Sequence, residues 1–206
     1  MKTLLQLNTS LFSDGGQSSR LAARFVADWR ASNPGGTVIA RDLARDPVPH
    51  LTAERFQSFV TPAGDRTPAQ HAVAGYSDAL IDELRRADVI VIGLPMYNFG
   101  VPSTLKAYFD HVARVGVTFR YTEKGPRGLL TGKKVYVFAT RGGSYAGTPG
   151  DTESAFVRQF LAFLGMDDVE FVYAEGLAIS EASKAAALSR AERTIERLFA
   201  PERLAA

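Results

Sequence analysis

Residues 87–102 read ADVIVIGLPMYNFGVP, and this stretch decides the fold. Its first half, Ala87 to Gly93, is the most apolar run in the chain and has the length and β-branched content of a strand buried on both faces. Pro95 lacks the N–H group that a strand ladder needs, so we expect the strand to end there. A strand of this kind is typical of a parallel sheet covered by helices.

The loop after this strand combines large apolar side chains with residues that favour turns. Met96, Tyr97 and Phe99 are large and apolar. Asn98 is typical of a turn, and a helix is expected to begin near Ser103. An aromatic loop at the carboxyl end of a buried strand is where an open α/β sheet binds a flat ligand. The alternative is that these side chains only close the core over the strand end, and position and composition favour neither interpretation.

Size and composition limit the classes of protein to consider. With 206 residues the chain fits one domain, residues 1–206, with a substantial core. A formal net charge of +2 without a basic run argues against nucleic acid as a partner. The apolar runs are far shorter than the roughly 20 residues of a membrane helix, and the N-terminus lacks a signal pattern. The absence of cysteine excludes disulfides and thiolate ligands, and a cytoplasmic location is the default.

The rest of the chain alternates strands with helices. Besides the central strand, we expect strands over residues 2–7, 37–43, 134–140 and 169–174, helices over 20–29, 53–60, 69–86, 102–113, 154–164 and 181–199, and a hairpin or excursion at 117–122. This alternation predicts an α/β three-layer sandwich, with a five-stranded parallel sheet and helices on both faces. In the flavodoxin-type strand order 2-1-3-4-5, the loops after the first, third and fourth strands converge on one crevice.

The loop after the first strand is rich in glycine and serine. It brings hydroxyl and backbone N–H groups to a helix N-terminus, which can bind an anion without a lysine. The residues concerned are Ser10, Gly16, Gln17 and Ser18. An ordinary helix cap by Ser18 or Ser19 is the alternative, and for this loop alone it is the favoured one.

The loop after the fourth strand, Thr140-Arg141-Gly142-Gly143, lets the backbone approach a ligand closely because glycine has no side chain. The alternative is a tight strand-to-helix turn. The Lys-Ser/Thr pair of a P-loop is missing, and no Gly-x-Gly-x-x-Gly follows the first strand. The histidines, His50, His71 and His111, lack metal-ligand spacing, so no metal site is predicted.

Together the three loops offer a hydroxyl-lined phosphate pocket, an aromatic clamp and a glycine-rich edge, but no conventional acid–base pair. A cofactor that brings its own chemistry fits this combination. FMN has one phosphate and a flat three-ring head, so the residues predict FMN.

The sequence also resembles the FMN-dependent NADH:quinone oxidoreductases, the azoreductase family. The resemblance covers almost the whole chain, with motifs that agree in order and spacing. These motifs are Pro95-Met96-Tyr97-Asn98-Phe99, Leu105-Lys106-x-Tyr108-Phe109-Asp110, residues 116–122, Gly132-Lys133-Lys134, Arg141-Gly142-Gly143 and Phe163-Leu164-Gly165.

Carried over by motif, the resemblance implies a complete cofactor site. The first loop would hold the FMN phosphate, the second would wrap the isoalloxazine with N–H groups near N5 and O4, and the third would reach the pyrimidine end. Thr140 departs mildly from the serine of many relatives but keeps the hydroxyl. The implied cofactor-binding residues are Ser10, Gly16, Gln17, Ser18, Pro95, Met96, Tyr97, Asn98, Phe99, Thr140, Arg141, Gly142 and Gly143.

The resemblance further implies a homodimer with both sites at the interface, where Phe99, Tyr121 and Phe163 are candidates for stacking on substrate. The implied mechanism is ping-pong: NADH or NADPH reduces FMN and leaves, and a quinone or an azo compound then takes two electrons. An azo bond needs two such cycles to become two amines. FMN carries the chemistry, so no catalytic side chain is predicted.

Two other functions stay open. One is a flavodoxin-like electron carrier, although carriers of this fold are usually strongly acidic and this chain is near neutral. The other is a flavin reductase that releases reduced FMN as its product.

Overall fold

The computed structural model describes residues 1–200, so the last part of the predicted domain, 201–206, lies outside the described residues. The strands are β1 (Thr3–Asn8), β2 (Thr37–Asp42), β3 (Val89–Pro95), β4 (Phe119–Thr122), β5 (Gly125–Gly128), β6 (Lys134–Thr140) and β7 (Asp168–Ala174). The α-helices are α1 (Gln17–Ser32), α2 (Ala53–Val60), α3 (Pro68–Arg86), α4 (Ser103–Val112), α5 (Thr152–Leu164) and α6 (Glu181–Leu198), and short 3-10 helices cover Ser13–Gly15 and Ala63–Asp65.

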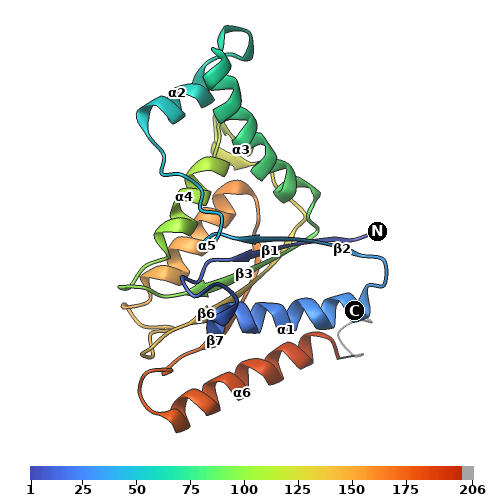
Figure 1. The fold of residues 1–206 in the computed structure, drawn as a ribbon, viewed down its shortest axis with the longest axis vertical. Coiled ribbons are helices and arrows are strands. Elements are labelled where there is room, and N and C mark those ends of the chain that lie inside the picture. The colour runs from blue at the N-terminus through green and yellow to red at the C-terminus, as the bar shows by residue number, and fades with distance from the viewer. Residues whose placement is uncertain (201–206) are drawn as a thin grey trace.

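The main sheet is parallel and carries helices on both faces (Figure 1). Within residues 1–200 it has five strands in the order β2-β1-β3-β6-β7. Because β6 and β7 are its fourth and fifth strands along the chain, this confirms the predicted 2-1-3-4-5 order and the α/β class. The order reverses between β1 and β3, which is where open sheets of this kind form a ligand crevice.

Side chains alternate across the central strand β3. Ile90 and Ile92 pack into the core under α3, α4 and α5, whereas Val91 packs into the core under α1 and α6 (Figure 1). All three side chains are at most 1% exposed. Burying a side chain of this size contributes about 1.5–3 kcal/mol, so the strand is stabilised from both faces, as predicted.

The end of β3 is also where the sequence predicts it. The strand ends at Pro95, and the next N–H group, that of Met96, donates to the carbonyl oxygen of Thr140 at 3.0 Å. This bond crosses from β3 to the end of β6. The loops after these two strands therefore begin side by side.

The predicted hairpin is confirmed, since β4 and β5 pair antiparallel. It rests on the C-terminal end of α5, where the N–H group of Leu130 donates to the carbonyl oxygen of Leu164 at 2.9 Å. A Cβ atom built on Gly128 would lie 2.0 Å from the backbone nitrogen of Gly165. Only glycine at position 128 permits this approach of two backbones.

We expect Gly128→Ala to lower the free energy of unfolding by about 1–3 kcal/mol, because the new methyl group meets backbone that cannot move aside cheaply. Gly75→Ala is the matched control, because Gly75 lies in α3 and, outside its own stretch of helix, no atom of the described residues lies within 4 Å of its would-be Cβ. That change should instead stabilise by up to about 1 kcal/mol through helix propensity. Urea denaturation of both variants tests this, and equal stabilities would contradict the packing argument.

Candidate functional site

Three loops meet at the carboxyl ends of β1, β3 and β6, which are neighbours in the sheet. Thr9 Oγ1 donates to the carbonyl oxygen of Gly93 at 2.7 Å, which fixes the first loop to β3. The hydroxyl of Tyr97 accepts from the N–H group of Leu11 at 3.2 Å and lies 3.5 Å from Ser10 Oγ. The predicted residues lie in these loops or at the ends of the strands and the helix that the loops join, and they are Ser10, Gly16, Gln17, Ser18, Pro95, Met96, Tyr97, Asn98, Phe99, Thr140, Arg141, Gly142 and Gly143.

The start of α1 has polar groups without partners. The N-cap residue is Gly16, and no side chain caps the helix, so the alternative of an ordinary cap by Ser18 or Ser19 is wrong. Both serines lie inside the first turn and are at most 1% exposed. Their hydroxyl oxygens have no hydrogen-bond partner among the described residues. Buried hydroxyls beside the free N–H groups of a helix start form a site for an anion.

Gly16 lets the first loop close on this helix start. A Cβ atom at position 16 would lie 2.1 Å from Ser10 Oγ, so any side chain there would displace Ser10. Ser10 is almost fully buried, and its Oγ accepts the N–H group of Phe12 at 3.2 Å. The serine hydroxyl is thus held against the free end of the helix.

The loop after β3 forms a tight turn with a strained backbone. Tyr97 and Gly100 exchange two backbone hydrogen bonds of 3.0 Å, and between them Asn98 and Phe99 have φ of 49° and 64°. A bulky residue such as phenylalanine rarely adopts this left-handed conformation, and such strain is concentrated at functional sites. In the described part of the chain the N–H groups of Asn98 and Phe99 have no acceptor, so they can serve a ligand.

The glycine-rich loop after β6 also presents N–H groups. The carbonyl oxygens of residues 141–143 accept the N–H groups of residues 176–178 at 2.9–3.1 Å. Within residues 1–200, the N–H groups of Gly142 and Gly143 find no acceptor. The loop is therefore fixed through its carbonyls, while its donors stay available.

Behind this loop the side chain of Arg141 is fully buried in a cluster of carboxylates. Its guanidinium lies 2.7 Å from Asp151, 3.3 Å from Glu153 and 3.1 Å from Glu175. Its backbone N–H group donates to the carbonyl oxygen of Ala174 at 3.0 Å. The N–H groups of Arg141 thus bond to acceptors inside the protein. The backbone N–H groups of the two glycines are the ones left to bind a ligand.

The carboxylates of this cluster differ in protonation. Burial raises the pKa of Glu153 to about 8, although the charge and hydrogen bond of Arg141 oppose the shift. Burial would also raise the pKa of Asp151, but hydrogen bonds from Arg141 and Ser154 and the charge of Arg141 outweigh it and hold that pKa below its usual value. The two pKa values are therefore shifted in opposite directions, and Glu153 keeps its proton to a higher pH than Asp151 does.

One aromatic residue of the site was missed by the sequence analysis. Tyr145 packs edge-on against Phe99 with ring centroids 5.6 Å apart, and its hydroxyl oxygen lies 2.8 Å from where a Cβ of Gly143 would be. Its place two residues after Gly143 was the available signal. Tyr121 and Phe163 instead pack on Phe119, with centroid distances of 5.6 and 4.3 Å, and form a separate aromatic cluster at the hairpin.

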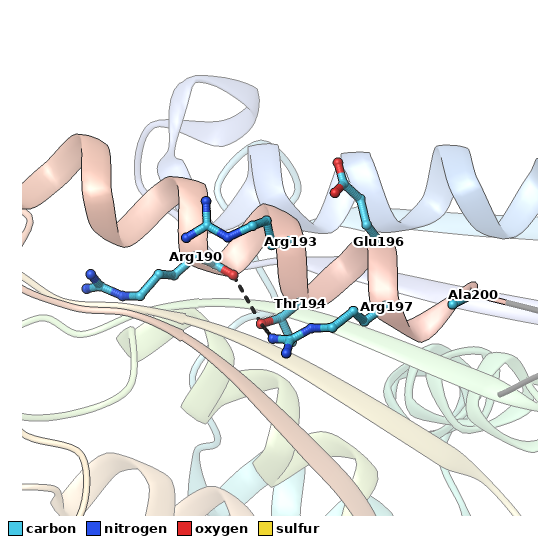
Figure 2. A pocket seen from close by; sticks show the side chains of 6 residues that line it. All are labelled: Arg190, Arg193, Thr194, Glu196, Arg197 and Ala200. Carbon is cyan, nitrogen blue, oxygen red and sulfur yellow. Dashed lines mark hydrogen bonds between the residues drawn. The ribbon is translucent and has the colours of Figure 1, made fainter. Parts of the chain in front are cut away.

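Other features give weaker candidates. Residues 1–200 contain no group of three His, Cys, Asp or Glu side chains able to hold a metal ion. No helix in the same range has the length and apolar character needed to span a bilayer. A hollow on α6 is lined by Arg190, Arg193, Thr194, Glu196, Arg197 and Ala200 (Figure 2). Its guanidinium groups lie apart rather than converging, and Arg197 bonds to Thr194 at 3.0 Å, so the hollow is an ordinary charged helix face (Figure 2).

We expect the buried Glu153 carboxyl to make stability depend on pH. The folded protein keeps this proton up to a pH of about 8, whereas the unfolded chain releases it near 4.5. The contribution to the free energy of unfolding is therefore complete below 4.5 and is lost as the pH rises to about 8. The maximum slope is about 1.4 kcal/mol per pH unit.

Glu153→Gln removes the titrating group but keeps its shape. The stability of the unmodified protein relative to this variant should therefore fall as the pH rises through that window. Urea denaturation at several pH values measures the difference. A difference that stays constant with pH would show that Glu153 ionises normally.

Comparisons with known proteins give a consistent result. The family model described as "Flavodoxin-like fold" matches residues 1–199. An FMN-dependent NADH:quinone oxidoreductase of Cellvibrio japonicus is 55% identical over 192 residues, covering 93% of this chain and 96% of the relative. The FMN-dependent NADH:quinone oxidoreductase 6 of Burkholderia lata is 53% identical over 95% of this chain and 98% of its own.

Solved structures agree with these matches. An FMN-dependent NADH-azoreductase from Bacillus anthracis, determined in complex with FMN, superposes with a TM-score of 0.85 at 25% identity, covering 97% of this chain and all of that one. An azoreductase from Bacillus anthracis str. Sterne gives a TM-score of 0.84 at 26% identity, with 96% of this chain and all of that one covered.

Proposed function

The chain belongs to the family of FMN-dependent NADH:quinone oxidoreductases, which has a flavodoxin-like fold, and we propose that it is an FMN-dependent enzyme that reduces quinones with NADH or NADPH. The likeness to azoreductases supports a second acceptor class, aromatic azo compounds, which would be cleaved reductively to amines. We propose that both acceptors are reduced in a ping-pong cycle. The cytoplasmic location stays a prediction from the sequence.

The observation that carries this proposal is the start of α1. In the described part of the chain, the buried hydroxyl of Ser18 has no partner and the helix has no side-chain cap, and Gly16 lets Ser10 lie against the free N–H groups. A monoester phosphate supplies the acceptors that these donors lack, and its negative charge favours a helix N-terminus. The residues present therefore fit the phosphate of FMN, with Gln17 contributing its backbone N–H group.

The other two loops fit the flat head of the same cofactor. Two residues with positive φ, Asn98 and Phe99, and two glycines, Gly142 and Gly143, present N–H groups that have no acceptor among residues 1–200. Such fixed donors bind carbonyl oxygens and favour negative charge at the edge they face. Phe99 is 59% exposed, so its ring is available to stack on a flat molecule.

FMN, when bound, would take up two electrons and pass them to the acceptor. The chain's own part is to bind and orient the two aromatic systems and to stabilise negative charge. We therefore assign no side chain an acid or base role.

The cycle can be tested by the visible absorption of the purified protein with FMN. We expect a flavin band that survives gel filtration, bleaches when NADH is added and recovers promptly when a benzoquinone follows. A chromophore lost during turnover would favour the flavin reductase. Bleaching without recovery on quinone would favour the electron carrier, and a protein that retains no flavin would reject the proposal.

A variant tests the phosphate pocket. Gly16→Ala should weaken FMN binding about tenfold or more, because the methyl group displaces Ser10 and overpacking of this kind costs about 1–3 kcal/mol. His71→Ala, a change of an exposed residue in α3, should leave FMN binding unchanged. Titration of FMN fluorescence measures both, and an unchanged affinity in Gly16→Ala would place the phosphate elsewhere.

We also propose that the protein is a homodimer. An apolar patch surrounds a hollow between α2, α4 and the hairpin, and its exposed members are Phe56, Val60, Val115 and Tyr121, with 45–71% of their surface accessible. Exposed apolar patches on a soluble fold mark interaction surfaces. A second copy covering this patch would bring the aromatic cluster of Tyr121 and Phe163 into a shared substrate pocket.

Val115→Glu is expected to prevent this association, because it would bury a charge without a partner. Ile179→Glu is the matched control, since Ile179 is 66% exposed, against 54% for Val115, but does not line the patch. Sedimentation equilibrium should find dimers for the unmodified protein and the control, and monomers for Val115→Glu. Dimers in all three proteins would show that the interface lies on another face.

A further inference from the structure

We propose that Glu175 is a positioning residue that holds the glycine-rich loop after β6 in its ligand-binding shape. The residue follows β7 directly and belongs to none of the sequence motifs quoted for the site. The proposal rests on the proposed function only for the identity of the ligand, because the loop and its contacts are present in the protein alone.

A single oxygen atom carries the role. Oε1 of Glu175 accepts the backbone N–H groups of Tyr145 at 2.8 Å and Ala146 at 2.9 Å. The same atom accepts Nη1 of Arg141 at 3.1 Å. Hydrogen bonds to a carboxylate are about twice as strong as neutral ones, so the loop has one strong anchor here.

The anchor divides the donors of the loop into two groups. The N–H groups of Tyr145 and Ala146 point to Glu175, whereas those of Gly142 and Gly143 have no acceptor within residues 1–200. The carbonyls of residues 141–143 are fixed by residues 176–178 at the near end of the loop. Glu175 fixes the far end, so the loop that carries the two glycine donors is held at both ends and these donors have a defined direction.

Glu175 also places an aromatic ring. Because its bond holds the backbone of Tyr145, it fixes where that side chain leaves the loop. The ring then lies against Gly143 and edge-on to Phe99. Beyond Ala146 the loop is closed by turn bonds within it, in which the N–H group of Thr148 donates to the carbonyl oxygen of Tyr145 and that of Asp151 to the carbonyl oxygen of Thr148.

Arg141 connects this anchor to the rigid part of the fold. Its guanidinium is 0% exposed and bonds to Asp151, which caps α5 by accepting the N–H group of Ser154 at 3.0 Å. The chain of contacts therefore runs from the loop through Glu175 and Arg141 to the start of α5. A loop joined to a buried ion pair of this kind is ordered before any ligand arrives, which lowers the entropy lost on binding.

The variant Glu175→Gln distinguishes the effect of the hydrogen-bond acceptor Oε1 from the effect of the negative charge. Oε2 of Glu175 has no hydrogen bond in the described structure, so Glu175→Gln can keep Oε1 in place and turn its amide nitrogen outward. Glu175→Ala removes the acceptor altogether. Asp168→Ala is the matched control, because Asp168 lies at the opposite end of β7, where its side chain forms an exposed ion pair with Lys134.

The first experiment is amide hydrogen exchange of the chain without FMN. In Glu175→Ala the amides of Tyr145 and Ala146 should exchange about tenfold faster or more, while those of β3 stay protected. Glu175→Gln and Asp168→Ala should match the unmodified protein. Unchanged protection of these two amides in Glu175→Ala would overturn the proposal. An equal loss of protection in β3 would also overturn it, because it would show that Glu175 stabilises the whole fold.

The second experiment measures FMN affinity by fluorescence titration. Glu175→Ala should bind FMN about tenfold more weakly or worse, and Glu175→Gln within about threefold of the unmodified protein. Full affinity in Glu175→Ala would overturn the positioning role. If the unmodified protein itself failed to bind FMN, the proposed function would fall, while the exchange experiment would still decide the role of Glu175 in the loop.

Discussion

The close approach of α1 to β3 is the contact on which the rest of the site depends. Gly93 makes it possible, because a Cβ there would lie 3.1 Å from the carbonyl oxygen of Ser18. Thr9 reinforces it by bonding to the Gly93 carbonyl. The uncapped helix start therefore lies next to the strand that ends in the aromatic turn. A ligand with a charged end and a flat end can therefore bind the helix start with one end and the aromatic turn with the other.

Most of the chemistry that this site offers comes from the backbone. The free donors belong to the first turn of α1, to Asn98 and Phe99, and to the glycines that follow Arg141. Side chains mainly decide where these donors point: the Tyr97 hydroxyl joins the first two loops, and the Arg141 cluster supports the third. A site built in this way orients a reactive cofactor without needing a titrating group of its own.

The fold could be predicted almost completely, because it depends on local patterns. The apolar run before Pro95 and the alternation of strands and helices are visible in the sequence, and the observed element ends lie within a few residues of the expected ones. The donors at the start of α1 and in the glycine loop were also expected. The Arg141 cluster was not, because Asp151 and Glu153 at the start of α5 and Glu175 after β7 are brought to Arg141 only by the tertiary structure.

The turn at Asn98 and Phe99 has a consequence for how this protein can change. A left-handed backbone costs a residue other than glycine about 1–2 kcal/mol, and Phe99 has this conformation. Its ring is mostly exposed, so burial of the side chain does little to offset this cost. Glycine at this position would relax the chain but remove the ring. Selection for thermal stability alone would therefore favour replacement of Phe99 by glycine. Retaining phenylalanine here requires selection for binding, so the two demands pull this position in opposite directions.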